Sequence, residues 1–305
     1  MKNSKKCYFK NTGFHNFGVA LDQSKSKKLK RRIKELRKLS KNIFYKNEKE
    51  FSQKGRYFRF APGVKNHNLL LKNELNFDLD FIEKSKNFKK NVTKIMGKNY
   101  KVIKKSIIRS VPYAYLPSWV RNKVIDVGRA NLNPYIKDEF QDIQHFHTAD
   151  FHQDMQTGKK FCTFYIYLDT VSRKDSCIKV LEGSHLLGAQ PYPHYLRKSN
   201  KFKNLWYYND YKNFIETHET SITGEAGTMF CFHGLALHGT YYNYSKSPRI
   251  SLRYLIKPDQ KNKDTVFMKS FKNIRGKLCI KDMKLARLDK KKDGEFKRTG
   301  MLIRN

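Results

Sequence analysis

The sequence is poor in cysteine and lacks long apolar runs, and each shortage disfavours a class of protein. No stretch approaches the roughly 18 apolar residues of a membrane span, and no apolar run follows the basic N-terminus as in a signal peptide. The cysteines are few, far apart and never in a CxxC pair, which disfavours a disulfide framework and a zinc knuckle; they are Cys7, Cys162, Cys177, Cys231 and Cys279. We therefore expect a soluble, unprocessed protein of the reducing cytoplasm.

Acidic residues are also scarce. Asp and Glu number 27 against 64 Lys and Arg in 305 residues, which gives a formal net charge of +37. Such a surface attracts phosphates, nucleic acids or anionic membranes. The charge is spread from Lys2 to Arg304, however, which favours a general compositional bias over a specific interface. We expect no specific nucleic-acid partner, and the charge is compatible with an anionic small-molecule substrate.

The first 135 residues are predicted to be helices and loops packed on a core. Residues 22–51 predict one amphipathic helix with a basic outer face, capped by Asp22 or Ser24. Its apolar positions recur at helical spacing, namely Leu29, Ile33, Leu36, Leu39, Ile43 and Phe44. A second helix is predicted from Asn73 to Ile95.

From about Asp142 short apolar and alternating runs replace the helical periodicity. Four segments are predicted to be strands: IQHFHTADFH, KKFCTFYIYLDTV, GTMFCFHGL and PRISLRYLIKP. They indicate an antiparallel β core over residues 136–258. Residues 187–220 interrupt it as a long insertion, which is typical of a lid or binding loop. Residues 259–305 form a basic C-terminal extension, so we expect one domain over 1–305.

A candidate metal site combines His152 and Asp154, in FHQDMQTG, with His238, in GLALHGTYYN. Residues i and i+2 on a strand point to the same face, so an imidazole and a carboxylate can bind one ion there. A third ligand from a distant strand completes a facial triad, which leaves coordination sites open for a 2-oxo acid and dioxygen. An isolated HxD pair is more often accidental, so the distant features decide its meaning.

Arg249 lies eleven residues after His238, in SPRISLRYLI. On a strand, Arg249 and Ser251 share one face, whereas Ile250 and Leu252 lie on the other. The planar fork of arginine suits a buried carboxylate, to which Ser251 can add a hydroxyl donor. A surface ion pair is the plainer interpretation of an isolated arginine, and the spacing to His238 argues against it here.

These motifs together resemble the phytanoyl-CoA dioxygenase family of iron(II)- and 2-oxoglutarate-dependent oxygenases, over about Gln141 to Ile256. The order is an HxD, a strand ending in Leu-Asp, a GSH element, a Gly-initiated strand, then a histidine followed by an arginine. The resemblance implies a mainly β fold with flanking helices, whose core is a cupin-like double-stranded β-helix (jelly roll). Two departures are Glu182, where a proline usually precedes GSH, and the lack of a recognisable substrate motif.

The resemblance also implies roles for individual residues. His152, Asp154 and His238 would bind iron(II), and Arg249 would anchor the distal carboxylate of 2-oxoglutarate, with dioxygen as the second co-substrate. Because Asp154 stands where halogenating relatives have a small residue, hydroxylation or another oxidation is implied. Gln144, Thr163 and Ser251 are candidate co-substrate contacts. The pocket candidates are aromatic residues that would exclude water, namely Phe161, Tyr165, Tyr167 and Phe232.

Several alternatives stay open. His145 and His147 lack a carboxylate at i+2, and His233 competes with His238 as third ligand, with only the spacing to Arg249 favouring His238. The protein could instead be a non-enzymatic basic β-barrel module that binds nucleic acid or an acidic polymer. It could also be a cupin metal enzyme, such as an isomerase, that uses no 2-oxoglutarate. The substrate, whether a small metabolite or a CoA-, lipid- or sugar-linked molecule, and the oligomeric state are not determined by the sequence.

Overall fold

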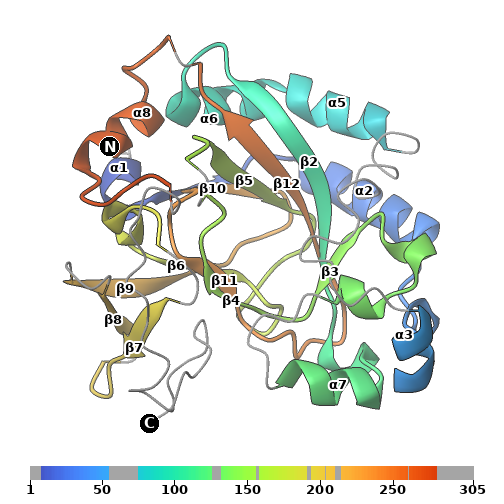
Figure 1. The fold of residues 1–305 in the computed structure, drawn as a ribbon. Coiled ribbons are helices and arrows are strands. Elements are labelled where there is room, and N and C mark those ends of the chain that lie inside the picture. Colours follow the sequence, from blue (N-terminus) through green and yellow to red (C-terminus); the bar gives the residue numbers. More distant parts are fainter. Residues whose placement is uncertain are drawn as a thin grey trace.

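Two curled sheets face each other in the computed structural model of the chain (Figure 1). The structure describes residues 8–54, 75–125, 132–155, 158–190, 194–202, 204–209, 214–259 and 261–279. The first sheet has the order β1-β10-β5-β12-β2-β3 and the second β4-β11-β6-β9-β8-β7. All neighbours are antiparallel except β2 and β3. The predicted mainly β jelly roll with flanking helices is confirmed.

The described strands are β1 Phe14–Val19, β2 Lys101–Ser110, β3 Gln144–Phe146, β4 Ala149–His152, β5 Cys162–Tyr167, β6 Ile178–Leu181, β7 Tyr195–Lys198, β8 Leu205–Asn209, β9 Phe214–Ile222, β10 Thr228–His233, β11 His238–Thr240 and β12 Arg249–Lys257. The α-helices are α1 Phe9–Thr12, α2 Gln23–Leu36, α3 Glu48–Lys54, α5 Asn76–Lys84, α6 Lys86–Met96, α7 Ser118–Ile125 and α8 Val266–Ser270. Short 3-10 helices are η1 Lys41–Ile43, η2 Tyr113–Tyr115, η3 Asn133–Tyr135, η4 Asp138–Phe140, η5 Ser184–Leu187 and η6 Phe271–Asn273. None of the described helices is long and apolar enough to cross a bilayer.

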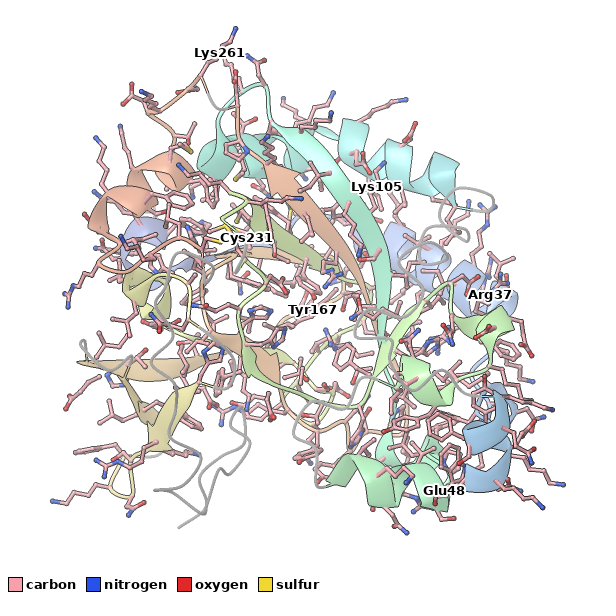
Figure 2. All side chains as sticks on the ribbon, in the orientation of Figure 1. Arg37, Glu48, Lys105, Tyr167, Cys231 and Lys261 are labelled. Carbon is pink, nitrogen blue, oxygen red and sulfur yellow. The ribbon has the colours of Figure 1, made fainter. Side chains whose placement is uncertain are left out.

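The alternation of β12 explains how the barrel is built. Ile250 and Leu252 belong to an apolar cluster that α2, α5 and α6 share, on the outer face of the first sheet. Since successive side chains point to opposite faces, Arg249 and Ser251 point into the space between the sheets. That interior also holds Tyr167, whose hydroxyl donates to the carbonyl of Ile222 on the second sheet (Figure 2). The inner face of β12 is therefore polar at Arg249 and Ser251.

The first 135 residues were predicted to be helices and loops. They also contain β1 and β2, which are strands of the first sheet. β1 pairs with β10 and β2 pairs with β12 along most of their lengths. Their partners lie more than 100 residues away in the chain, so no local pattern announces the pairing. In KVIKKSIIRS, lysines at both alternating faces also obscure the period of two.

Both predicted N-terminal helices are wrong in their extent. α2 begins at the predicted cap, since the Asp22 side chain accepts from the backbone N–H groups of Ser24 and Lys25, but it ends at Leu36. The next residue, Arg37, forms a salt bridge to Asp142, with 2.5 Å between Nη2 and Oδ2. The predicted remainder to 51 is η1 and the start of α3, which pack elsewhere.

The second predicted helix divides at Ser85, which ends α5 and caps α6 by accepting from the N–H of Phe88. Its first two residues, 73 and 74, lie outside the described residues. A capping serine between two helices offers the backbone an alternative to continuing the helix. Apolar periodicity alone does not reveal such a break.

The predicted insertion and C-terminal extension both contain ordered elements that pack on the core. Within 187–220, β7, β8 and β9 extend the second sheet, so the segment contains three strands where a lid or binding loop was predicted. Trp206 packs on Phe151 of β4 at a ring distance of 5.1 Å. In the extension, α8 buries Phe267 completely in the helix-covered cluster.

Candidate metal centre

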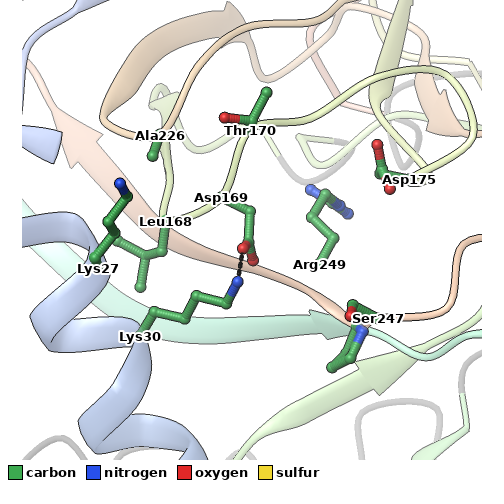
Figure 3. Close-up of a pocket in the computed structure, with 10 residues that line it drawn as sticks. Lys27, Lys30, Leu168, Asp169, Thr170, Asp175, Ala226, Ser247 and Arg249 are labelled. Atoms are coloured by element: carbon green, nitrogen blue, oxygen red, sulfur yellow. Dashed lines mark hydrogen bonds and ion pairs between the residues drawn. The ribbon is translucent and has the colours of Figure 1, made fainter.

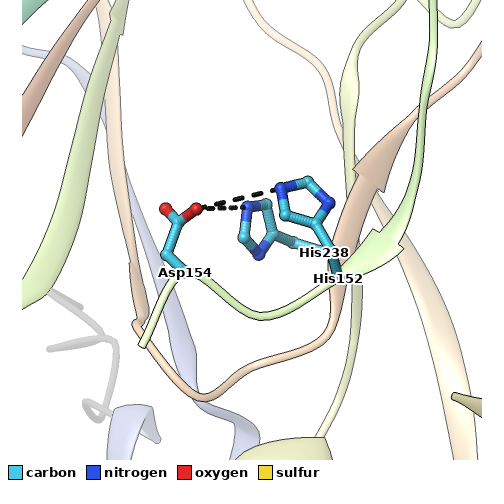
Figure 4. Close-up of side chains that lie close together, drawn as sticks. All are labelled: His152, Asp154 and His238. Atoms are coloured by element: carbon cyan, nitrogen blue, oxygen red, sulfur yellow. Dashed lines mark ion pairs between the residues drawn. The ribbon is translucent and has the colours of Figure 1, made fainter. Parts of the chain in front are cut away.

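His152, Asp154 and His238 converge on one point between the sheets, although 84 residues separate the last two (Figure 4). The Nε2 atoms of both histidines lie 3.8 Å from Oδ1 of Asp154, and their rings lie 4.3 Å apart. One ligand atom from each residue lies within 4.8 Å of the others. Metal–ligand bonds of about 2.0–2.2 Å to a shared ion are compatible with such separations.

Strand pairing sets this convergence. His152 ends β4 and His238 begins β11, and the two are direct partners in the antiparallel register. Asp154 lies two residues beyond β4, where the side chain of Gln153 fixes the turn. The amide of Gln153 donates to the carbonyls of Gly188 (2.8 Å) and Leu235 (2.7 Å). The buried residue between the two ligands therefore holds their backbone.

The backbone also sets the protonation of both imidazoles. Nδ1 of His152 lies 2.7 Å from the carbonyl oxygen of Asp150, and Nδ1 of His238 lies 3.0 Å from that of Ala236. A carbonyl oxygen only accepts, so Nδ1 carries the proton in each neutral ring. Nε2 is then the unprotonated nitrogen on the side of Asp154, which is the state that a metal ligand requires.

Asp154 is held in its ionised form. Burial by itself raises the pKa of this carboxyl, but His238, Arg253 and His152 lower it, and the net pKa lies well below the usual range. Thr163 Oγ1 also donates to Asp154 Oδ2 at 3.0 Å. A carboxylate and two imidazoles with unprotonated Nε2 atoms are a donor set that suits iron(II).

Arg249 lies deeper in the barrel and carries hydrogen-bond donors without partners. It is 1% exposed, and Nη1 donates to Ser251 Oγ at 2.9 Å. Its Nε and Nη2 have no hydrogen-bond partner among the described residues. The guanidinium lies over the rings of Phe146 and Tyr167, at 5.3 and 5.5 Å. A carboxylate entering here would satisfy two buried N–H donors with the bidentate geometry that arginine favours.

A sequence profile of the phytanoyl-CoA dioxygenase (PhyH) family matches residues 9–251. The chain belongs to the phytanoyl-CoA dioxygenase family. It is accordingly a 2-oxoglutarate-dependent non-haem iron enzyme, with iron(II) as metal and 2-oxoglutarate and dioxygen as co-substrates. The triad fits the metal, and the unpartnered donors of Arg249 fit a carboxylate of 2-oxoglutarate.

Solved structures of similar fold include other non-haem enzymes. The 2-oxoglutarate-dependent epimerase SnoN of nogalamycin biosynthesis is 12% identical, with a TM-score of 0.48 over 82% of this chain and 80% of that chain. AviO1 from Streptomyces viridochromogenes is 13% identical, with a TM-score of 0.47 over 83% and 92%. EvdO2 from Micromonospora carbonacea, complexed with 2-oxoglutarate, is 11% identical, with a TM-score of 0.47 over 85% and 91%. No protein with a curated description matches the sequence significantly.

The other predicted co-substrate contacts of this PhyH-family chain lie on the inner face of the first sheet. Thr163 is on β5, and its hydroxyl contacts Asp154, so it acts on the metal ligand itself. Gln144 is on β3, two residues before Phe146 and on the same face. Since Phe146 packs against Arg249, Gln144 lies on the side of the barrel expected for the co-substrate.

The aromatic pocket candidates occupy different parts of the barrel. The ring of Phe232 lies 4.1 Å from His238, and Tyr165 stacks on Phe232 at 5.8 Å. Tyr167 lies beneath Arg249, and its hydroxyl forms hydrogen bonds with the backbone of the second sheet. Phe161 packs in a separate cluster with Met155. Phe232 and Tyr165 are therefore the candidates that border the metal centre.

The competing histidines do not join the triad. Among the described residues, the triad is the only group of three metal-binding side chains within reach of one ion. Nδ1 of His147 lies 2.9 Å from the carbonyl of Val111. His233 packs against His185 and Phe267, each at 5.1 Å. The structure therefore groups His238, and not His233, with His152 and Asp154.

A pocket of 360 Å³ reaches Arg249 from outside (Figure 3). Its wall includes an ion pair between Lys30 of α2 and Asp169, together with Lys27 and Ser247. None of the three candidate ligands lines it. The case for the metal centre therefore depends on the ligand geometry and not on this pocket.

Two cations near the candidate metal centre were not predicted from the sequence. The charge of Arg253 lowers the pKa of Asp154. The charge of Asp154 in turn acts on Lys104, where it opposes the decrease in pKa caused by burial. Arg253 continues the inward series of Arg249 and Ser251 at steps of two, a pattern that the sequence does contain. Lys104 lies on β2, which was not predicted to be a strand, so no signal pointed to it.

Proposed function

We propose that this PhyH-family protein is a dioxygenase that hydroxylates a small organic substrate, with iron(II) bound by His152, Asp154 and His238. The observation that carries the proposal is the convergence of two Nε2 atoms on one carboxylate oxygen, each at 3.8 Å. The three ligands occupy one side of the ion and leave the other side for co-substrates. Asp154 supplies the carboxylate, which favours hydroxylation over halogenation.

Arg249 and Ser251 hold the distal carboxylate of 2-oxoglutarate in this proposal. The supporting observation is that two guanidinium N–H groups are buried without partners. When bound, the metal and 2-oxoglutarate supply the oxidising chemistry. The chain's own residues orient them, and Phe232 and Tyr165 exclude water beside the ligands. We also propose a reducing compartment such as the cytoplasm, because the cysteines of the described chain are free thiols.

Anaerobic reconstitution with iron(II) and 2-oxoglutarate tests the proposal. The wild type should show the weak visible charge-transfer band of the chelate, and should form succinate after exposure to air. His152→Ala should lose both because the metal site loses a ligand, whereas His218→Ala, at an exposed histidine, should retain both. Folded wild-type protein that binds iron(II) but shows neither band nor succinate would contradict the proposal.

Two alternatives make opposite predictions with the same variants. A cupin enzyme that uses no 2-oxo acid would keep its activity after Arg249→Gln. A basic module that binds a polyanion would bind polynucleotide with steep salt dependence, and His152→Ala would not weaken that binding. No observation in the described structure favours either alternative over the oxygenase.

A further inference from the structure

Lys104 and Arg253 lie side by side on the inner face of the first sheet. Arg253 follows Arg249 and Ser251 at steps of two on β12, so all three face the interior. On β2, Ser106 is the direct partner of Arg253, and its hydroxyl accepts from Arg253 Nε at 3.2 Å. Lys104, two residues before Ser106, faces the same side. Two cations and a hydroxyl thus share one area of the barrel wall.

This area adjoins the metal centre. Across β5, β12 and β2, Thr163, Leu255 and Lys104 form one row of register partners. Thr163 is the residue whose hydroxyl contacts Asp154. Two strand spacings of about 4.8 Å separate β2 from β5, and a lysine side chain directed inward covers part of that distance, so that Asp154 acts electrostatically on Lys104.

The second cation, Arg253, lies in the adjacent row of register partners. Tyr165, Arg253 and Ser106 are register partners across the same three strands, and the charge of Arg253 opposes the rise that burial causes in the pKa of Tyr165. The charge of Arg253 lowers the pKa of Asp154. Both rows therefore face the space in front of the metal ligands.

Neither cation has a carboxylate within ion-pair distance in the described parts of the chain. The next lysine on β2 shows the contrast, because Lys105 on the outer face pairs with Glu83 at 2.6 Å. Lys104 is half-buried, and burial lowers its pKa. Holding two like charges together in a partly buried wall is costly unless an anion accompanies them.

The charges of the proposed iron centre leave these two cations in excess. The charges of iron(II) and Arg249 are matched by Asp154 and the two carboxylates of 2-oxoglutarate. Both of those carboxylates are engaged, one by Arg249 and one at the metal. A further anion is therefore needed to complete the balance.

We propose that Lys104 and Arg253, with the hydroxyls of Ser106 and Tyr165, bind a carboxylate or phosphate group of the substrate. This inference rests on the proposed oxygenase function and narrows its substrate to an anion. The oxidised carbon would lie close to the charged group, because the subsite adjoins Asp154. Arginine provides the bidentate fork and lysine the point charge that oxyanion recognition commonly combines.

Paramagnetic relaxation in the protein loaded with Mn(II) and 2-oxoglutarate tests the subsite. The probes are phenyl phosphate, observed by ³¹P, and phenylacetate labelled with ¹³C in the carboxyl group. Relaxation by Mn(II) falls steeply with distance, so anions on the basic outer surface contribute little. We expect saturable relaxation of at least one probe in the wild type, and the stronger of the two identifies the group.

Arg253→Gln and Lys104→Gln should each lower the affinity for that probe at least about tenfold, because a charged hydrogen bond contributes about 1.5–3 kcal/mol. Arg253→Lys keeps the charge and should lose less. Lys101→Gln is the matched control, since Lys101 is exposed on the same strand, and should leave binding unchanged. Thermal unfolding of each variant verifies that it is folded.

Three results would overturn the inference. Equal relaxation in the wild type and the Gln variants would place the anion elsewhere. A tenfold loss of 2-oxoglutarate affinity in those variants, with probe binding unchanged, would assign both cations to the co-substrate. Relaxation of neither probe in protein that binds Mn(II) and 2-oxoglutarate would exclude the subsite while leaving the oxygenase proposal intact. Failure to bind Mn(II), seen as an undiminished free Mn(II) resonance, would instead contradict the proposed function itself.

Discussion

Arg249 shows at the scale of one residue how function opposes stability. A buried guanidinium costs several kcal/mol unless its donors are satisfied, and within the described chain Arg249 donates one hydrogen bond, to Ser251. The rings of Phe146 and Tyr167 offset part of this cost by cation–π attraction. Nε and Nη2 have no hydrogen-bond partner among the described residues. We infer that the hydrogen bonds that these donors do not form in the folded chain are formed when a carboxylate binds.

Arg249→Gln should therefore separate stability from co-substrate binding. Without 2-oxoglutarate, the melting temperature of the metal-loaded variant should equal or exceed that of the wild type, because the unpaired buried charge is gone. The affinity for 2-oxoglutarate should fall at least about tenfold, since a charge-assisted contact contributes about 1.5–3 kcal/mol. Calorimetric titration and thermal unfolding with and without 2-oxoglutarate measure both effects.

Arg109 provides the matched control. It is also 1% exposed, but Nη2 donates to the carbonyl of Arg37 at 2.7 Å. Burial lowers the pKa of Arg109 to about 10, and the charge of Asp142 opposes this decrease. Arg109→Gln should lower the melting temperature and leave the affinity for 2-oxoglutarate unchanged. A melting temperature that falls equally in both variants, with equal affinities, would refute the role given to Arg249.

At the scale of elements, β11 determines whether the two histidines meet. This short strand lies between β4 and β6 and is fully buried. Gly239, next to His238, allows β4 to approach closely, because a Cβ there would lie 2.4 Å from the carbonyl oxygen of Ala149. The contact is with backbone, which cannot rotate away. The spacing of β4 and β11, and with it the spacing of the imidazoles, depends on this glycine.

Gly239→Ala should push β4 away and separate His152 from His238. We expect a loss of about 1–3 kcal/mol in unfolding free energy, typical of overpacking, and at least a tenfold loss of metal affinity. Mn(II) titration and denaturant unfolding provide the two measurements. Gly18→Ala is the control: its φ of +74° strains an alanine, but nothing lies within 4 Å of the added Cβ. It should lower stability and keep metal affinity; if metal affinity instead falls equally in both variants, the argument from β11 fails.

Across the whole molecule, the described N- and C-terminal segments meet around two buried histidines. His233 packs against Phe9 of α1 and Phe267 of α8, and Nε2 of His185 donates to the carbonyl of Lys10. Because strands from residues 14–19 and 101–110 share a sheet with 249–257, we propose that the chain folds as one domain.

Burial makes this junction sensitive to acid. Desolvation lowers the pKa of His185 from 6.5 to about 4, and it lowers the pKa of His233 well below its ordinary value, with His185 as a second cause. Below pH 6.5 the unfolded chain binds protons that the folded chain does not. The unfolding free energy should therefore fall as the pH decreases from about 6.5 to about 4. The effect of Asp154 lies in a different window, because its stabilisation is lost only below its ordinary pKa of 3.8.

Urea unfolding at a series of pH values measures this dependence in the metal-free protein. His185→Gln should flatten the decrease between pH 6.5 and 4, since a glutamine does not titrate. His218→Ala, at an exposed histidine, should leave the slope unchanged. A wild-type slope of zero in this window would show that neither buried histidine gains a proton on unfolding.

The sequence by itself determined the features that depend on neighbouring residues. The sequence spacing brought His152 and Asp154 close together, although Asp154 lies in a bend beyond the end of β4. The alternation of β12 gave Arg249 and Ser251 a common face. The cap at Asp22 is equally local. These follow from the periods of strand and helix, which any short window contains.

Only the tertiary structure decided which distant segments became partners. It ended α2 at Leu36, recruited β1 and β2 into the first sheet, and placed Lys104 beside Arg253, 149 residues away. The physical reason is that register between strands is fixed by backbone hydrogen bonds and by burial of a whole face. A local pattern shows that a strand has two faces, but the partner that covers each face is set by the rest of the chain.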